Sequence, residues 1–229
     1  MARSLGNALS DFFSALPDEA TVTGREVRRV LRAIDALHGT GNTHLPRIPI
    51  EAETNPNRFG AYGRTTGGQP VRIRIERNGD HQALTTAHEI GHFLDHQAFG
   101  TTPKFASELD SPVLVNWRQA VSASLAITAL RQMASRKSIV VSQPDGDAFV
   151  HLVDSTYVDH LLRLRELWAR SYAQYVATRS NDPVMRARLD RERVRKLGMP
   201  YYPEQWEDDD FAPIAEAFDE LLKINGWRG

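Results

Sequence analysis

The first third of the chain alternates between helical and strand-like spacing of its hydrophobic residues. Apolar side chains recur at helical intervals over 24–38 and, more weakly, over 4–15, so both segments are expected to be helices. Val and Ile alternate with Arg and Glu over 71–77, which predicts a half-buried strand. A short strand is expected at 48–51. The segment 55–68, rich in Asn, Gly and Thr, fits a hairpin arm or a loop.

The rest of the chain is dominated by helical patterns. Helices are expected over 81–97, 113–135, 156–179, from Pro183 onward, and over 213–224. Between them, 138–142 and 148–153 flank the turn sequence PDGD, which predicts a small hairpin or a flexible loop. The order of elements predicts an α+β fold, mostly helical, with a small mixed sheet.

Composition narrows the possible chemistry. The 229 residues include no cysteine, which excludes disulfides, thiolate metal sites and cysteine nucleophiles. Any metal ion must therefore bind to His, Asp or Glu. Lys and Arg number 28 and Asp and Glu 29, so the net charge is −1 with neutral histidine. This balance argues against nucleic acid or an anionic membrane as the partner.

Targeting signals are weak along the whole sequence. The N-terminal apolar stretch is interrupted by polar residues and glycine, which makes a poor signal peptide. The longest candidate membrane span, 113–133, contains Asn116, Arg118 and Gln119, and is better explained as a buried or half-buried helix. We therefore expect a cytoplasmic protein without a membrane partner, whose oligomeric state the sequence leaves open.

One basic cluster, 186–196, could in principle contact nucleic acid. Asp190 and Glu192 interrupt it, and five acidic residues follow within 204–210. Pairing between the two segments on a solvated face is the better prediction.

The segment TTAHEIGHFLD contains the pattern HExxH within a predicted helix. His88 and His92 are four residues apart, so their side chains lie on one face and can bind a single zinc ion. Glu89 is offset around the helix, where it can take a proton from a zinc-activated water and pass it to a leaving amine. Histidines that only fill a core are the alternative explanation.

A catalytic zinc site requires a third protein ligand. A third histidine six residues after His92 is excluded because position 98 is Ala, and His96 lies too far along the helix axis. A glutamate on a later helix remains: Glu166 lies among Leu, Trp and Ala, where an unpaired carboxylate would be costly to bury. Pairing with Arg163 or Arg170 is the other explanation for Glu166. Glu108, in a probable loop, is the rival ligand.

Asp95, three residues after His92, has two possible roles. It can accept a hydrogen bond from the second nitrogen of a ligand imidazole, or it can be a solvated helix residue. The sequence favours neither role.

The sequence HEIGHFLD, followed downstream by ELWARSYAQYV, resembles zincin-like peptidase domains of the gluzincin type. These include the catalytic domain of anthrax lethal factor and, more similar still, peptidase domains of phage and mobile-element polyvalent proteins. The aromatic tail YYPEQWEDDDF is similar to that of the phage-associated group. The resemblance covers roughly 59–211. We expect a zincin-like domain over 43–229, preceded by an N-terminal helical segment over 1–42. The resemblance also implies one Zn²⁺ held by His88, His92 and Glu166, and it supports Asp95 as a family feature.

The sequence departs from this family at the residue that stabilises the transition state. Lethal factor carries a tyrosine seven residues before its glutamate ligand, and here that position is Asp159. Tyr157 and His160 are close by, and either can supply the oxyanion donor. The resemblance further suggests that the strand over 71–77 is a sheet edge that pairs with an extended substrate, although its arginines can also protect such an edge.

Together these features predict a zinc metallopeptidase that hydrolyses peptide bonds in a protein or peptide substrate, with Glu89 as general base. Two alternatives stay open. One is a non-catalytic metal-binding module of a phage or mobile-element particle. The other is an effector protease that acts on one host protein.

Overall fold

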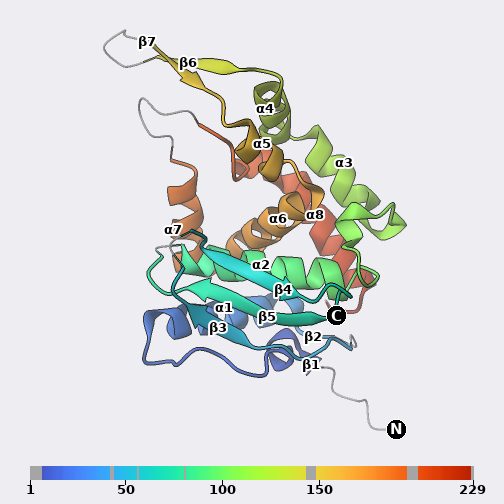
Figure 1. Ribbon diagram of the computed structural model, residues 1–229. Helices are drawn as coiled ribbons and strands as arrows, with labels where there is room; N and C mark the ends of the chain where they lie inside the picture. The colour runs from blue at the N-terminus through green and yellow to red at the C-terminus, as the bar shows by residue number, and fades with distance from the viewer. Residues whose placement is uncertain are drawn as a thin grey trace.

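The computed structural model describes residues 7–41, 44–55, 57–79, 81–142, 148–194 and 201–227. Within these residues the chain forms an α+β fold in which helices predominate and the strands form small sheets (Figure 1). This confirms the fold class predicted from the hydrophobic pattern. Every helix in the described part of the chain is too short or too polar to cross a membrane.

A mixed three-stranded sheet covers one side of the molecule. It consists of β3 (Ile50–Glu53), β4 (Gly60–Arg64) and β5 (Pro70–Glu76) in the order β3-β5-β4. β3 runs parallel to β5, and β4 runs antiparallel to it. Ile73 and Ile75 of β5 are fully buried, as their alternation with charged residues predicts.

The strand predicted to lie at the sheet edge is in fact central. β5 has a neighbour on each side because 60–64, within the segment left open as a hairpin arm or loop, forms β4 and takes the outer position. Arg72 and Arg74 do not protect an edge. They pair with Glu51 and Glu53 of the neighbouring strand β3, at 3.0 and 3.4 Å. A peptide that extends this sheet must therefore use β4 or β3.

The N-terminal part of the chain packs into the same core as the rest. The helix expected over 4–15 is wrong: Leu9–Phe12 form one short 3₁₀ turn, and residues 1–6 lie outside the described residues. The chain then pairs with the stretch before β3, because Ser14 N–H donates to the carbonyl of Ile48 at 3.0 Å. The helix α1 (Val22–His38), capped by Thr21, presents its buried face to this core.

The two helices that carry the motif residues pack closely against each other. These are α2 (Gln82–Gln97) and α6 (Leu164–Arg179), shown in Figure 1, with Gly91 of α2 at their contact. A Cβ at Gly91 would lie 3.1 Å from the Cα of Ala169, so glycine allows this approach. The indole N–H of Trp168 donates to the Gly91 carbonyl at 3.0 Å. Small residues on facing helices thus bring the HExxH helix and the helix of Glu166 together.

The long helix expected over 113–135 is interrupted. It forms α3 (Val115–Ala123) and α4 (Leu125–Ala134), separated by Ser124 in an extended conformation with φ −68° and ψ 148°. The hydroxyl of Ser124 accepts hydrogen bonds from the Trp206 indole at 3.0 Å and from the amide of Ile127. A local cap and a distant tryptophan therefore stabilise a break that the apolar pattern does not reveal.

The helix expected over 156–179 is interrupted as well. It forms α5 (Ser155–Leu161) and α6, with Arg163 extended between them. The guanidinium of Arg170, on α6, donates to the carbonyl of Leu161 at the end of α5. This break places Glu166 in the first turn of its helix.

Further elements complete the described structure. They are β1 (Asn7–Ala8), β2 (Thr40–Gly41), the short 3₁₀ turns Ala106–Glu108 and Pro112–Leu114, β6 (Ser138–Ser142), β7 (Ala148–Leu152), α7 (Pro183–Glu192) and α8 (Asp208–Ile224). β6 and β7 form the predicted hairpin, which projects from the helices in Figure 1. The predicted turn PDGD lies outside the described residues. α8 begins five residues earlier than expected.

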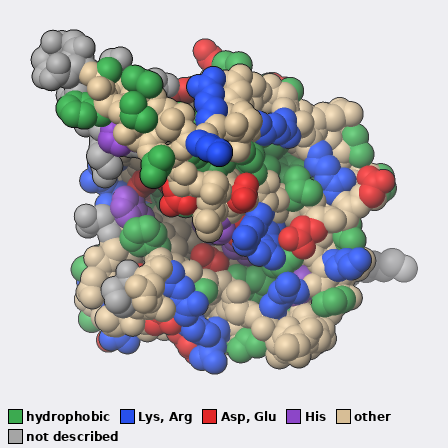
Figure 2. Space-filling view, turned by 45° about the horizontal axis from the view of Figure 1, so that its top comes forward, with side chains coloured by type: hydrophobic (Ala, Val, Ile, Leu, Met, Phe, Trp, Pro, Cys, Tyr) green, Lys and Arg blue, Asp and Glu red, His purple; other side chains and the backbone are tan. Residues whose placement is uncertain are grey.

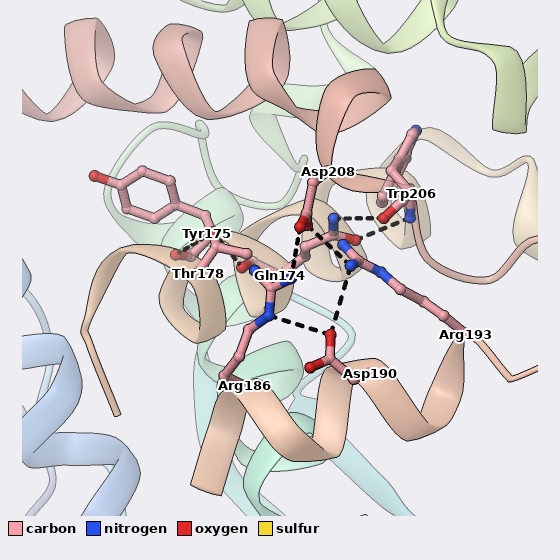
Figure 3. A network of polar contacts seen from close by, with 8 residues as sticks. All are labelled: Gln174, Tyr175, Thr178, Arg186, Asp190, Arg193, Trp206 and Asp208. Atoms are coloured by element: carbon pink, nitrogen blue, oxygen red, sulfur yellow. Dashed lines mark hydrogen bonds and ion pairs between the residues drawn. The ribbon is translucent and has the colours of Figure 1, made fainter. Parts of the chain in front are cut away.

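Figure 3 shows how α6 and α7 are tied to the start of α8. The side-chain amide of Gln174 exchanges two hydrogen bonds with the backbone of Trp206, at 2.8 and 2.9 Å. Arg186 and Arg193 of the basic cluster both pair with Asp208 and Asp190. The predicted pairing between the basic cluster and the acidic tail is therefore confirmed for these residues, while Arg195 and Lys196 lie outside the described residues.

Candidate metal centre

Two helices bring together the two motif histidines and the glutamate selected from the downstream helix. The Nε2 atoms of His88 and His92 lie 3.4 and 3.5 Å from Oε2 of Glu166. One potential ligand atom from each residue lies within 4.8 Å of those of the other two. His88 and His92 come from successive turns of α2, and Glu166 comes from the first turn of α6. These three residues could hold a metal ion.

The charges of this cluster match such a site. Glu166 is only 8% exposed, and although burial alone would raise its pKa, hydrogen bonds with His88 and His92 hold the pKa well below the usual range. The carboxylate is therefore ionised and can act as a ligand. The Nδ1 atom of His92 is buried and has no hydrogen-bond partner among the described residues. Two imidazoles and a carboxylate are a donor set that suits a divalent cation such as zinc.

Glu89 lies beside the three candidate ligands, held by the backbone of β4. Its carboxylate accepts a hydrogen bond from the backbone N–H of Tyr62. A Cβ at Gly60 would lie 3.0 Å from Oε1 of Glu89, so glycine lets the strand run directly against this side chain. Burial raises the pKa of Glu89 to about 7, against the opposing effect of His88.

These residues line a cleft of about 890 Å³ between β4, α2, α5 and α6. Besides His88, His92, Glu89 and Glu166, its wall includes basic, aromatic and apolar side chains from all four elements. In Figure 2, histidine, acidic and basic side chains gather along a hollow across the middle of this face. His92 and Glu166 are thus buried and His88 is half-buried, and all three line an open cleft.

The structure distinguishes the two candidates for the oxyanion donor. The Nε2 atom of His160, at the end of α5, lies 3.7 Å from Oε2 of Glu166, and 46% of its side chain is exposed. Tyr157 lines the same cleft, but its hydroxyl donates to the carboxylate of Glu204. The ring of Tyr157 also packs edge-on against Tyr202. His160 is therefore beside the candidate ligands, whereas the Tyr157 hydroxyl is engaged elsewhere.

Asp95 has neither of the roles considered for it. It is completely buried, and its two oxygens accept hydrogen bonds from the backbone N–H and the hydroxyl of Ser107, at 2.8 and 2.6 Å. It is therefore not a solvated helix residue, and it binds the loop after α2 instead of a ligand imidazole. The sequence-based expectation failed because Ser107, twelve residues away, comes close to Asp95 only in the folded chain.

We expect replacement of Asp95 by alanine to reduce the free energy of unfolding by about 2–4 kcal/mol, because it leaves two polar groups of Ser107 buried without a partner. Asparagine is the matched control, since its amide can satisfy both groups. Burial raises the pKa of Asp95 to about 7. Between about pH 4 and pH 7 the folded state keeps a proton on Asp95 that the unfolded state releases. The free energy of unfolding of the wild-type protein therefore falls as the pH rises through this range.

Urea unfolding at pH 5 and at pH 8 measures both effects. The asparagine variant should compare more favourably with wild type at pH 8 than at pH 5. Equal stabilities of the alanine variant and wild type at pH 5 would show that the Ser107 contact contributes nothing.

The rival candidate ligands lie outside the group of three candidate metal ligands. Glu108 pairs with Arg165 at 3.5 Å and is not part of the group formed by His88, His92 and Glu166. His96 is buried, and its Nδ1 atom lies 2.8 Å from the hydroxyl of Tyr62.

The cleft also contains residues that sequence reasoning did not identify. Arg64, Phe105 and Arg165 line it beside the candidate ligands, and both guanidinium groups lie over the ring of Phe105. Arg64 ends an unassigned strand and Phe105 lies in a loop, so neither belongs to a recognisable pattern. The fold alone brings them together.

Comparison of the chain with protein-family models, with curated proteins and with solved structures finds no match. The functional inference therefore rests on the geometry of the cleft and on the motif residues themselves.

Proposed function

We propose that this chain is a zinc metallopeptidase with a zincin-like catalytic domain. One observation carries the proposal: the two histidines of an HExxH helix converge with a glutamate from another helix, and the motif glutamate lies beside them in an open cleft. A structural metal site would need the three ligands, but it would not need Glu89 at the wall of the cleft.

His88, His92 and Glu166 would hold the ion, which leaves one position of a tetrahedral site for water or substrate. When bound there, zinc would supply a Lewis acid that polarises a carbonyl and increases the acidity of water. Two imidazole nitrogens and one carboxylate oxygen would bind the ion. The Nε2 atoms of both histidines face Glu166, so both rings are already oriented for this role.

Glu89 moves the proton in the proposed reaction. Its carboxylate takes a proton from the water whose oxygen attacks the carbonyl carbon of the substrate peptide bond. As the C–N bond breaks, Glu89 gives that proton to the departing nitrogen, which leaves as an amine. The Tyr62 N–H and the close backbone at Gly60 keep the carboxylate in one position throughout.

His160 is the better candidate for stabilising the negative charge on the substrate oxygen. Its Nε2 atom is near the oxygen of Glu166 that faces the ligand histidines, and its side chain is partly exposed to the cleft. Stabilising the charge requires an N–H directed at the substrate oxygen. The hydroxyl of Tyr157 would first have to leave Glu204.

The free edge of β4 supports a peptide as the substrate. Hydrogen bonds of an antiparallel pair alternate along the strand, so every second residue of β4 directs its backbone groups away from β5. One of these groups, the Tyr62 N–H, already donates to Glu89, so a peptide would pair with the remaining ones. Gly60, Ala61, Tyr62 and Arg64 all line the cleft. An extended peptide could pair with this edge and pass beside Glu89 and the zinc ligands.

Metal removal and return test the proposal. The purified protein should contain or take up one zinc ion per chain, and it should cleave members of a broad peptide mixture. Chelation should abolish cleavage, and one equivalent of zinc should restore it. If the zinc-loaded protein cleaves nothing in the mixture, the peptidase assignment is wrong and a non-catalytic metal-binding module is favoured. If zinc does not bind, the metal assignment is wrong as well.

A further inference from the structure

We infer that the cleft selects peptides with an acidic side chain close to the scissile bond, which it binds through Arg64 and Arg165 over the ring of Phe105. This inference rests on the proposed peptidase function and names its substrate class. The guanidinium carbons of Arg64 and Arg165 lie 4.9 and 6.0 Å from the centroid of that ring. We call these three residues the Phe105 subsite.

Arg64 is held in place, but its charge is not neutralised. It is the last residue of β4, its side chain is exposed, and it donates a hydrogen bond to the backbone carbonyl of Pro103. Among the described residues, no carboxylate lies within 4.0 Å of its guanidinium nitrogens. Four of its five N–H donors therefore remain available, and a guanidinium in this state is suited to bind a carboxylate through two hydrogen bonds.

Arg165 adds a second positive charge at the same ring. It approaches from α6, immediately before the candidate ligand Glu166, at 3.6 Å from Oε1 of that residue. Its other partner is Glu108 at 3.5 Å, and about a third of its side chain is exposed. Because Glu166 would share its charge with a bound cation, Arg165 would be less neutralised in the zinc-loaded protein.

Four arginines and four glutamates line the cleft, so its total charge is balanced and an anion can be attracted only by local charge. Its basic side chains are Arg58, Arg64, Arg165 and Arg170. Apart from Glu89 and Glu166, which face the metal position, its acidic side chains are Glu192 and Glu204. Glu192 contacts His81, and Glu204 accepts from Tyr157, so both already have partners. Arg58 pairs with Glu53, whereas no carboxylate among the described residues lies within 4.0 Å of Arg64, so a substrate carboxylate would meet the positive charge of Arg64.

The Phe105 subsite is also within reach of a peptide bound at the metal centre. The rings of Phe105 and His92 are 6.0 Å apart. β4 begins at Gly60 beside Glu89 and ends at Arg64, a length of about 13 Å for four residues at about 3.3 Å each. A peptide paired with β4 would thus place a side chain at the Phe105 subsite within about four residues of the bond beside Glu89.

Peptide pairs that differ only by Glu or Gln test the inference. A library with one fixed position at a time identifies the position, and kcat/KM of the zinc-loaded protein is then compared for the matched pair. We expect a preference for Glu of about five- to tenfold, which decreases at higher salt. Arg64→Gln should bring the ratio close to one, and Arg64→Glu should favour Lys over Gln.

Arg131→Gln is the matched control, because Arg131 also donates to a backbone carbonyl, that of Ser122, but lies outside the cleft. It removes the same charge and should preserve the preference for Glu. Cleavage with no preference for Glu at any position, or a preference unchanged in Arg64→Gln, would overturn the inference and leave the peptidase assignment intact.

A complete absence of cleavage would instead contradict the proposed function. The same peptide pairs would then be compared by fluorescence anisotropy. Tighter binding of the Glu peptide that depends on Arg64 would support an acidic ligand for the cleft. Equal binding of the two peptides would overturn the inference that the cleft prefers an acidic side chain, whether or not the protein is a peptidase.

Discussion

The Glu89→Gln variant is expected to retain one zinc ion per chain and to lose peptide cleavage by a factor of about 10²–10⁴, the usual contribution of a general base. Glutamine has the shape of glutamate, and its side-chain oxygen can still accept the Tyr62 N–H. The carboxylate that takes the proton from water is lost, while the three ligand side chains are untouched. The measurements are zinc content and kcat/KM on the best peptide substrate.

Glu216→Gln serves as the control for this substitution. Glu216 is an exposed residue of α8 outside the cleft, and its variant should match wild type in both measurements. If Glu89→Gln binds zinc and cleaves as fast as wild type, then Glu89 is not the base. If it loses zinc as well as activity, Glu89 has a structural role in the site that its position beside the ligands does not suggest.

The motif helix is the part of the site that the sequence predicts best. Helical spacing over 81–97 agrees with α2 to within one residue at its start, and the spacing of His88 and His92 alone places them on one face. Gly91 lies in the same helix, and the structure shows that it packs against Ala169 of α6. Local periodicity succeeds here because the relevant residues lie within one helix.

Glu166 could be proposed but not positioned from the sequence. Its distance from the histidines depends on the break at Arg163 and on the contact between Gly91 and Ala169. That contact joins segments more than 70 residues apart. Hydrophobic spacing continues across Arg163, so the sequence predicted one long helix. The extended backbone there is accompanied by the hydrogen bond from Arg170 to Leu161, which only the folded chain can form.

The sheet edge and the residues of the cleft wall were harder still to predict from the sequence. A glycine-rich segment with little hydrophobic content gave weak evidence for β4, and without β4 the order of the strands could not be inferred. Strand order is a property of tertiary packing, because edge and centre can have the same alternation of residues. For the same reason, Arg64 and Phe105 carry no local signal of their proximity to His92.

The Glu166→Ala variant is expected to weaken zinc binding by more than about 100-fold, since even the partners of metal ligands contribute about 10–100-fold. The effect can be read from stability. At a free zinc concentration 1,000 times the dissociation constant, a bound ion stabilises the folded state by about 4 kcal/mol. At the same concentration, a 100-fold weaker site would stabilise it by about 1.4 kcal/mol. Thermal unfolding with and without zinc, together with zinc content after gel filtration, measures the difference.

Glu108→Gln separates the two carboxylates that the sequence offered as the third ligand. Glu108 pairs with Arg165 and stays outside the metal cluster, so its variant should gain as much stability from zinc as wild type does. If Glu166→Ala also keeps the full gain, then two histidines with some other group hold the ion. If Glu108→Gln loses the gain while Glu166→Ala keeps it, the loop after α2 would have to move toward the histidines when zinc binds. That outcome would transfer the third ligand from α6 to the loop and change which face of the cleft the metal presents to a substrate.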